Sequence, residues 1–179
     1  IQSLKAGHES AYMQLVNSHK DMVQGLCYSY LNNFQDAEDT SQEVFIQVFK
    51  SIGSFKEQST LKTWIYRIAI SKCQDFIKSK NRKKRFGQHT GYHDVEERLE
   101  SSSQTPERLL ENKENMELLN QAIDQLNEVQ RNVFVLNHMQ GKTNKEISDI
   151  LDMPKSTVDS HVKRSKDKVR RIFSGLAAA

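Results

Sequence analysis

The chain has 179 residues, and its seven glycines and two prolines make up about 5% of it against a usual ~12%, which disfavours all-β and collagen-like folds. The formal net charge of +3 hides an alternation along the chain, which is −3 over 1–50, +8 over 51–90, −7 over 91–130 and +5 over 131–179. Two basic surfaces separated by an acidic segment are typical of a protein that contacts one long polyanion twice, although a basic run is as often only a solvated helix face.

Apolar residues recur with a helical period through the first part of the chain. Over 11–27 they predict two helices or one long bent helix. Over 36–52 they keep the 3.6-residue period for four turns, with Phe49 among the apolar positions and acids in the first turn, where the helix dipole favours negative charge. A polar loop over 54–60 then leads to a basic helix that runs out into NRKKR. We expect these helices to form a first domain over residues 1–85.

The middle of the chain predicts a flexible linker. Residues 86–104 hold two glycines, a serine run and no sustained apolar period. Thr105 and Pro106, followed by an acid, are typical of a helix start. We therefore expect 86–113 to contain the linker and the beginning of the next helix, and a second domain to occupy 114–179.

Two capping boxes mark helix starts in the second domain. Asn127 with Gln130 precedes one apolar stripe, and Thr143 with Glu146 precedes another. A break over 152–154 follows, and then a longer basic helix whose valines face inward. Two helices joined by a three-residue turn, the second of them basic, predict a helix-turn-helix.

The longer basic helix carries side chains suited to recognising duplex DNA. One α-helix fits the major groove, where Arg favours guanine and Ser or Thr bond to several bases. Asp159 could accept from a cytosine amino group or orient Arg164. The alternative is a solvated structural hairpin, which we disfavour because the motif and the positive charge occur together. The residues predicted on or beside the DNA-facing side are Lys155, Ser156, Thr157, Asp159, Ser160, Lys163 and Arg164.

The first basic helix combines cations with aromatic rings, as proteins that bind single-stranded nucleic acid do. Stacking on such a ring contributes ~1–3 kcal/mol per base. Trp64 and Phe76 are more simply explained as core residues. We therefore assign base contact first to the preceding loop, which carries Phe55.

Residues 36–85 resemble region two of bacterial sigma factors, through DAED followed by QEVF and through TWIYRIA. Residues 115–173 resemble region four, and the absence of intervening domains resembles the small extracytoplasmic-function group. This resemblance implies an all-α protein with two small helical domains, a region 2 bundle and a region 4 helix-turn-helix, joined by a flexible linker. The segment NKEISDILDMPKSTVDSHV is also similar to the DNA-binding module of one-component response regulators. A one-component helix-turn-helix transcriptional regulator therefore stays open as the alternative.

The resemblance implies a sigma factor that directs core RNA polymerase to specific promoters and assists their melting. The polymerase contacts would be the clamp coiled coil and the flap, and the DNA partner would be promoter DNA in duplex and single-stranded form. Family members are often held by an anti-sigma factor, which is a further partner to consider. In the family the DAED to QEVF helix docks on the clamp, which implies a polymerase-binding set of Asp36, Asp39, Gln42, Glu43 and Phe45.

In the same family the loop before TWIYRIA captures a base flipped out of the minus-ten element. Asp75 falls where the family often has a polar residue that lines the pocket, and the cations of that helix would follow the separated strand. The implied minus-ten set is Ser54, Phe55, Lys56, Glu57, Ser59, Thr60, Arg67, Lys72, Asp75, Lys78 and Arg82. The residues of the longer basic helix that are predicted to face duplex DNA would bind the minus-thirty-five element.

Two residues depart from the family pattern. Thr40 occupies a position that is usually apolar, which we interpret as a more exposed edge of its helix. Asp159 stands where a basic residue is common in the recognition helix, which bears on the promoter preference.

The remaining motifs predict neither an enzyme nor a cofactor. The sequence has no Gly-rich phosphate loop, no G-x-S-x-G and no H-E-x-x-H. His89 and His93 lack a third ligand, so we expect a solvated pair and no metal site. Cys27 and Cys73 lie on apolar helix faces and are expected to be core thiols in a reducing cytosol. Without an apolar run of ~18 residues or a signal peptide, we expect a cytoplasmic protein with no membrane insertion.

Overall fold

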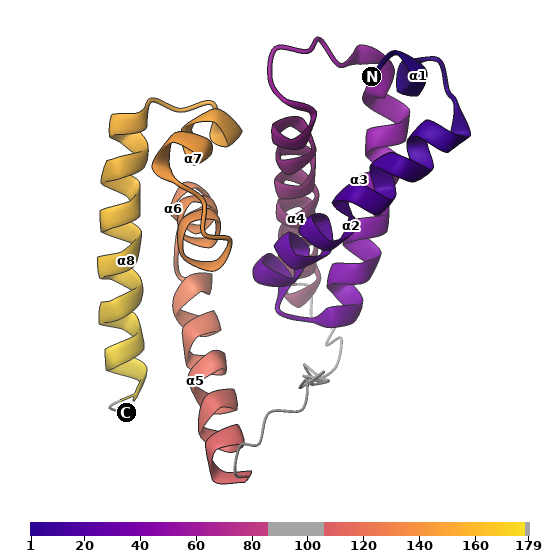
Figure 1. The fold of residues 1–179 in the computed structure, drawn as a ribbon. Helices are drawn as coiled ribbons and strands as arrows, with labels where there is room; N and C mark the ends of the chain where they lie inside the picture. Colours follow the sequence, from indigo (N-terminus) through magenta and orange to yellow (C-terminus); the bar gives the residue numbers. More distant parts are fainter. Residues whose placement is uncertain (86–105, 178–179) are drawn as a thin grey trace. The chain divides into compact units, whose positions relative to one another are not determined.

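The computed structural model describes residues 1–85 and 106–177, and these fold into helices with no strand among them (Figure 1). The all-α prediction is confirmed. The chain divides into two compact units, one built around the first four helices and the other around the last four. The linker expected over 86–104 lies outside the described residues, and the domain limits of 1–85 and 114–179 stay predictions.

The first unit consists of α1 (Gln2–Lys5), α2 (Glu9–Leu31), α3 (Phe34–Ser51), the short 3-10 helix η1 (Ile52–Ser54) and α4 (Leu61–Arg85). Helices α3 and α4 lie side by side, and α2 packs across both (Figure 1). The stretch 11–27 forms one helix, which settles the choice left open by its apolar pattern. Fully buried aliphatic residues from all three helices make the core, among them Val23, Leu26, Val44, Val48 and Ile65.

Two consecutive asparagines make the corner between α2 and α3. Asn32 ends α2 in the left-handed conformation, with φ of 48°, a region that Asn tolerates better than most residues. Asn33 begins α3, because its side chain accepts a hydrogen bond from the backbone N–H of Asp36 at 2.8 Å. This corner fixes where the acidic first turn of α3 starts.

Cys27 of α2 and Cys73 of α4 meet in the core of the first unit. Both side chains are fully buried, both thiols are free, and the two Sγ atoms lie 3.7 Å apart. The contact with Cys27, together with burial, raises the pKa of Cys73, because a charged thiolate is disfavoured there. The prediction that both cysteines are core residues is confirmed.

The second unit consists of α5 (Pro106–Asp124), α6 (Glu128–Phe134), the π-helical turn η2 (Val135–Met139), α7 (Asn144–Leu151) and α8 (Lys155–Ala177). Helix α8 packs along α6 and α5 (Figure 1). Helix α5 begins at Pro106, as its start signal predicts. The buried residues that join these helices are Ala122, Ile123, Leu126, Phe134 and Val169.

Both predicted capping boxes are present in the second unit. Asn127 and Gln130 exchange side-chain and backbone hydrogen bonds at the start of α6, and Thr143 and Glu146 do so at the start of α7. Asp152 then ends α7 in the left-handed conformation, with φ of 53°, and α8 begins three residues later. The predicted helix-turn-helix is therefore formed by α7, this turn and α8.

Candidate functional site

An exposed stripe runs along α3, from acidic residues in its first half to apolar residues in its second. Asp39, Gln42 and Glu43 are exposed, as expected of residues that meet a partner. The stripe continues at the same helical spacing through Ile46 and Phe49, which are 52% and 55% exposed. We call these five residues the α3 surface. Since exposed large apolar side chains in a row are uncommon on a protein that functions alone, the α3 surface has the character of a docking site.

Three expectations for α3 need correction. Phe45 is only 8% exposed, and the Tyr12 hydroxyl donates to its backbone carbonyl at 2.6 Å, so its ring belongs to the core and not to a binding surface. Thr40 is 3% exposed, so it is a core position and not an exposed edge. Phe49 is exposed, although it belongs to the apolar period of this helix, and its ring makes an edge-on contact with the Tyr12 ring, with centroids 5.2 Å apart.

Asp36, also predicted to meet a partner, is held within the first unit. Its Oδ2 accepts from Lys80 Nζ at 2.9 Å, and Lys80 lies 5.6 Å from the centre of the Phe76 ring. Glu43 makes a looser ion pair, 3.5 Å long, with Lys72. Acids of α3 are therefore paired with lysines of α4, and among these acids Glu43 keeps most of its side chain in solvent.

The 54–60 loop is fixed at both ends. Phe55, a member of the predicted minus-ten set, is 5% exposed and packs on Trp64, with ring centroids 5.0 Å apart, so its ring is not open to a base in this conformation. Thr60 begins α4, because its hydroxyl oxygen accepts from the backbone N–H of Thr63 at 3.1 Å. Of the other residues predicted in this loop, Ser54, Lys56 and Glu57 are exposed, and Ser59 is half-buried.

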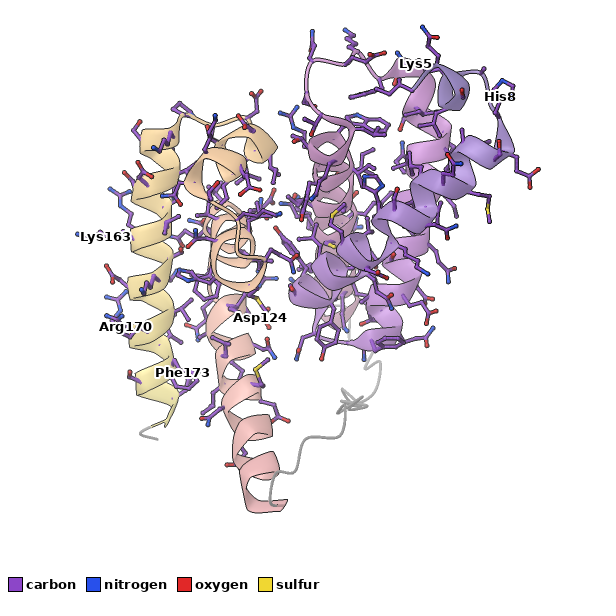
Figure 2. The ribbon with its side chains drawn as sticks, in the orientation of Figure 1. Lys5, His8, Asp124, Lys163, Arg170 and Phe173 are labelled. Atoms are coloured by element: carbon purple, nitrogen blue, oxygen red, sulfur yellow. The ribbon has the colours of Figure 1, made fainter. Side chains whose placement is uncertain are left out.

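The N-terminal helix contacts this loop. Lys5 Nζ lies 2.8 Å from Glu57 Oε1 and 6.0 Å from the centre of the Phe55 ring (Figure 2). The hydrogen bond and the positive charge of Lys5 lower the pKa of Glu57. Glu57 has a positive φ of 57°, a conformation that is uncommon outside glycine and asparagine. Lys5 therefore holds a loop residue whose backbone is in a sparsely populated region, and the sequence patterns gave no indication of this contact.

Helix α4 carries several cations, and two of them line a polar hollow. Arg67, Lys78 and Arg82 are exposed, whereas Lys72 is half-buried beside Glu43. A hollow of about 540 Å³ is lined by Asp75, Lys78, Asn81 and Arg82. The structure therefore places Asp75 beside two of the cations predicted with it, at the edge of a concave surface. Trp64 and Phe76 are half-buried.

The DNA-facing residues predicted on α8 occupy the N-terminal half of that helix. Lys155, Ser156, Asp159, Ser160, Lys163 and Arg164 are exposed, and Thr157 is half-buried. Val158 and Val169 are buried as expected, whereas Val162 is half-buried. Figure 2 shows Lys163 pointing away from the other helices of the second unit. Asp159 accepts from the Asn144 side chain at 2.6 Å, a partner that the sequence did not indicate.

An apolar groove of about 630 Å³ opens between α5, α6 and α8. Met116, Leu119, Phe134 and Phe173 contribute apolar walls, with Phe173 pointing toward α5 in Figure 2. Lys166 and Arg170 stand at its basic side, and burial, followed by the charge of Lys166, lowers the pKa of His138 there. A groove with an apolar floor and cations beside it matches an amphipathic helix with acidic residues.

Among the described residues, no three histidine, cysteine or acidic side chains come together as a metal site. His89 and His93 lie outside the described residues. None of the described helices is both long and apolar enough to cross a membrane.

Two family models match the chain, one in each unit. Residues 15–83 match Sigma-70 region 2, and residues 116–169 match Sigma-70 region 4. The ECF RNA polymerase sigma factor SigW of Bacillus subtilis is 31% identical to the chain in an alignment that covers 98% of the chain and 96% of SigW. The chain belongs to the ECF sigma factor family. The alternative of a one-component regulator is therefore set aside.

This ECF sigma factor is also similar to a further curated protein and to solved structures. The sigma-H factor of Pseudomonas aeruginosa is 26% identical over 98% of the chain and 93% of its own length. In fold, the chain resembles CnrH, solved in complex with the cytosolic domain of CnrY, with a TM-score of 0.66 at 17% identity over 97% of the chain and 94% of CnrH. It also resembles RpoE of Bartonella quintana, solved with the anti-sigma factor NepR, with a TM-score of 0.66 at 16% identity over 92% and 97%.

As a sigma factor, the protein directs core RNA polymerase to promoters and takes part in opening them. Its two partners are thus core RNA polymerase and promoter DNA. Sigma factors act as initiation factors and leave the chemistry to the polymerase.

Proposed function

We propose that this sigma factor binds the clamp coiled coil of core RNA polymerase through the α3 surface. The observation that carries the proposal is the exposed stripe from Asp39 to Phe49, in which carboxylates precede large apolar side chains on one helix face. The acids complement a basic partner and steer its approach, while Ile46 and Phe49 supply apolar area that is buried on docking. Asp36 contributes less, because its charge is already paired with Lys80.

In the same proposal, the 54–60 loop and α4 handle the minus-ten element. The exposed loop residues and the hollow beside Asp75 receive an extruded base, and the surrounding cations hold the backbone of the separated strand. Phe55 anchors the loop through its ring contact with Trp64. Its part is therefore to shape the loop, and the exposed polar residues make the base contacts.

Helix α8 reads the minus-thirty-five element as duplex DNA. Its exposed N-terminal half enters the major groove, and Lys155, Lys163 and Arg164 supply phosphate and guanine contacts. The apolar groove between α5, α6 and α8 takes a helical segment of the polymerase flap, which fits its apolar floor and basic side. We propose that the protein acts in the cytoplasm. An anti-sigma factor is the class of inhibitor that would compete with polymerase and DNA for these surfaces.

The experiment that tests the proposal is co-purification of the full chain with core polymerase. Asp39→Lys combined with Glu43→Lys reverses two charges on the α3 surface and should abolish co-purification, while circular dichroism shows unchanged helical content. Asp21→Lys combined with Glu9→Lys reverses two exposed charges on α2 and is the matched control, which should bind normally. Normal polymerase binding by the α3 variant would exclude this helix as the docking site.

A further inference from the structure

One carboxylate stands among cations on the exposed N-terminal half of α8. Asp159 shares this side with Lys155 and Lys163, and all three side chains are exposed. An acid at this place repels DNA phosphates and weakens attraction to any duplex, whatever its sequence. A benefit that depends on sequence is needed to offset that cost.

Asp159 is held in place by a chain of amide side chains. Asn144, the first residue of α7, donates from Nδ2 to Asp159 Oδ1 at 2.6 Å. The other end of the Asn144 amide is also engaged, since Asn137 Nδ2 lies 3.4 Å from Asn144 Oδ1 and donates to the Lys142 carbonyl at 3.0 Å. Because Asn144 accepts on one side and donates on the other, its amide group presents the NH₂ end to Asp159.

The hydrogen bond with Asn144 leaves Asp159 able to bind another donor. An ionised carboxylate accepts on both oxygens, and Asn144 engages only Oδ1. The fixed Oδ1 removes rotational freedom from the side chain before DNA arrives, so less conformational entropy is lost on binding.

Only two bases offer a donor in the major groove, the adenine N6 and cytosine N4 amino groups. Adenine places its N7 acceptor beside N6, and a carboxylate oxygen is repelled by that acceptor. Cytosine presents its amino group without a neighbouring acceptor of its own, which is why Asp and Glu pair with cytosine. An acceptor-only side chain at this position therefore selects cytosine.

We infer that Asp159 specifies one cytosine of the minus-thirty-five element, and that Asn144 is the positioning residue that orients its carboxylate. The inference rests on the proposed entry of α8 into the major groove. Lys163 follows Asp159 by one helical turn on the same side, so it lies in reach of the guanine or phosphate next to that cytosine.

The test uses holoenzyme assembled from the full chain and core polymerase, with promoters that carry each base in turn at every position of the minus-thirty-five element. Asp159→Ala should reduce the preference for cytosine at one position about fivefold to tenfold and leave other positions unchanged. Asp159→Asn keeps the size of the side chain and pairs with adenine, so it should shift the preferred base at the same position from cytosine to adenine. Asp167→Asn, which removes an exposed acid further along α8, is the matched control and should change no base preference.

The role of Asn144 is tested by its effect on the same base. Asn144→Ala should weaken the cytosine preference about twofold to threefold, and it should have no further effect on that preference once Asp159 is alanine. A purely structural contact between α7 and α8 would instead lower thermal stability and leave every base preference unchanged. That outcome would overturn the inference.

Two further outcomes separate the inference from the proposed function. If Asp159→Ala strengthens binding to all promoters equally, the acid only repels phosphate and selects no base. If the unaltered holoenzyme shows no preference at any minus-thirty-five position, the proposed role of α8 fails as well. A preserved preference that both Asp159 variants leave unchanged contradicts the inference alone.

Discussion

Lys80 of α4 reaches across to Asp36 in the first turn of α3, with Nζ and Oδ2 only 2.9 Å apart. The aspartate is also placed by the cap at Asn33, whose side chain accepts from the Asp36 N–H. Two residues 44 positions apart, on consecutive α-helices, are thus joined by a charged pair at the point where α3 begins. The pair therefore contributes to the stability of the first unit.

Asp36→Asn should therefore lower the free energy of unfolding of the first unit by ~0.5–1 kcal/mol, the range of a partly exposed ion pair. Urea denaturation followed by circular dichroism measures this change. Asp39→Asn is the matched control, because Asp39 lies on the same helix and its carboxylate accepts only from the neutral Gln35 side chain, at 3.2 Å. Equal losses for the two variants would mean that the pair with Lys80 contributes nothing.

Shortening the 54–60 loop should separate promoter binding from promoter melting. Deletion of Gln58 and Ser59 removes the middle of the loop and keeps both the Phe55 contact and the Thr60 cap. We expect a closed promoter complex that lacks permanganate reactivity at minus-ten thymines, since contacts to the extruded base offset an unstacking cost of about a few kcal/mol. Alanine at both positions preserves loop length and is the control. Full reactivity in the deletion variant would assign melting to residues outside the loop.

The ion pair between Lys5 and Glu57 predicts a pH dependence at the loop. The pKa of Glu57 is lowered below its usual 4.5 by Lys5, so the charged form is favoured in the folded state. The contribution of the pair is present above the unfolded-state pKa and is lost as the pH falls through the lower folded-state value. Carboxyl NMR titration should find the Glu57 pKa below 4.5 in the native chain and close to 4.5 in Lys5→Ala. A pKa that is the same in both proteins would show that Lys5 does not hold the loop.

Arg131 is a buried cation of the second unit, and its charge is paired with a carboxylate. Its guanidinium donates to Asp124 at 2.7 Å and to the Ile123 carbonyl at 3.3 Å. Asp124→Ala leaves the buried charge with one neutral acceptor, which should cost ~1–3 kcal/mol of stability. Thermal unfolding measures the loss, and Glu117→Ala, at an exposed acid of α5, is the control. No difference between the two variants would mean that solvent replaces the carboxylate.

Local signals in the sequence were sufficient for most helix starts. Asn127, Thr143 and the Pro106 start are recognised within a few residues, because a cap depends on side chains three positions apart. Asn33 caps α3 in the same way, although the apolar period alone predicts a start at Asp36. The division into two helical units followed from composition in the same local way.

Contacts between helices could not be predicted in this way. Val48 and Phe49 both fit the apolar period of α3, yet only the packing of α2 and α4 determines that Val48 is buried and Phe49 is exposed. The pairing of Asp36 with Lys80, and of Asp159 with Asn144, likewise depends on residues 44 and 15 positions apart. For the candidate site, the sequence indicated which helices carry charged and polar residues at regular spacing, and tertiary contacts decided which of those side chains are available.

The reactivity of the two buried thiols can report when the helices of the first unit separate. The chain has only two cysteines, and both lie between α2 and α4 with no exposed surface. An alkylating reagent reaches them only when these helices separate, so the labelling rate of the unmodified protein measures local opening of that unit. The second unit contributes no signal, and the binding of polymerase, DNA or an inhibitor to the first unit can thus be followed as slower alkylation without adding a probe.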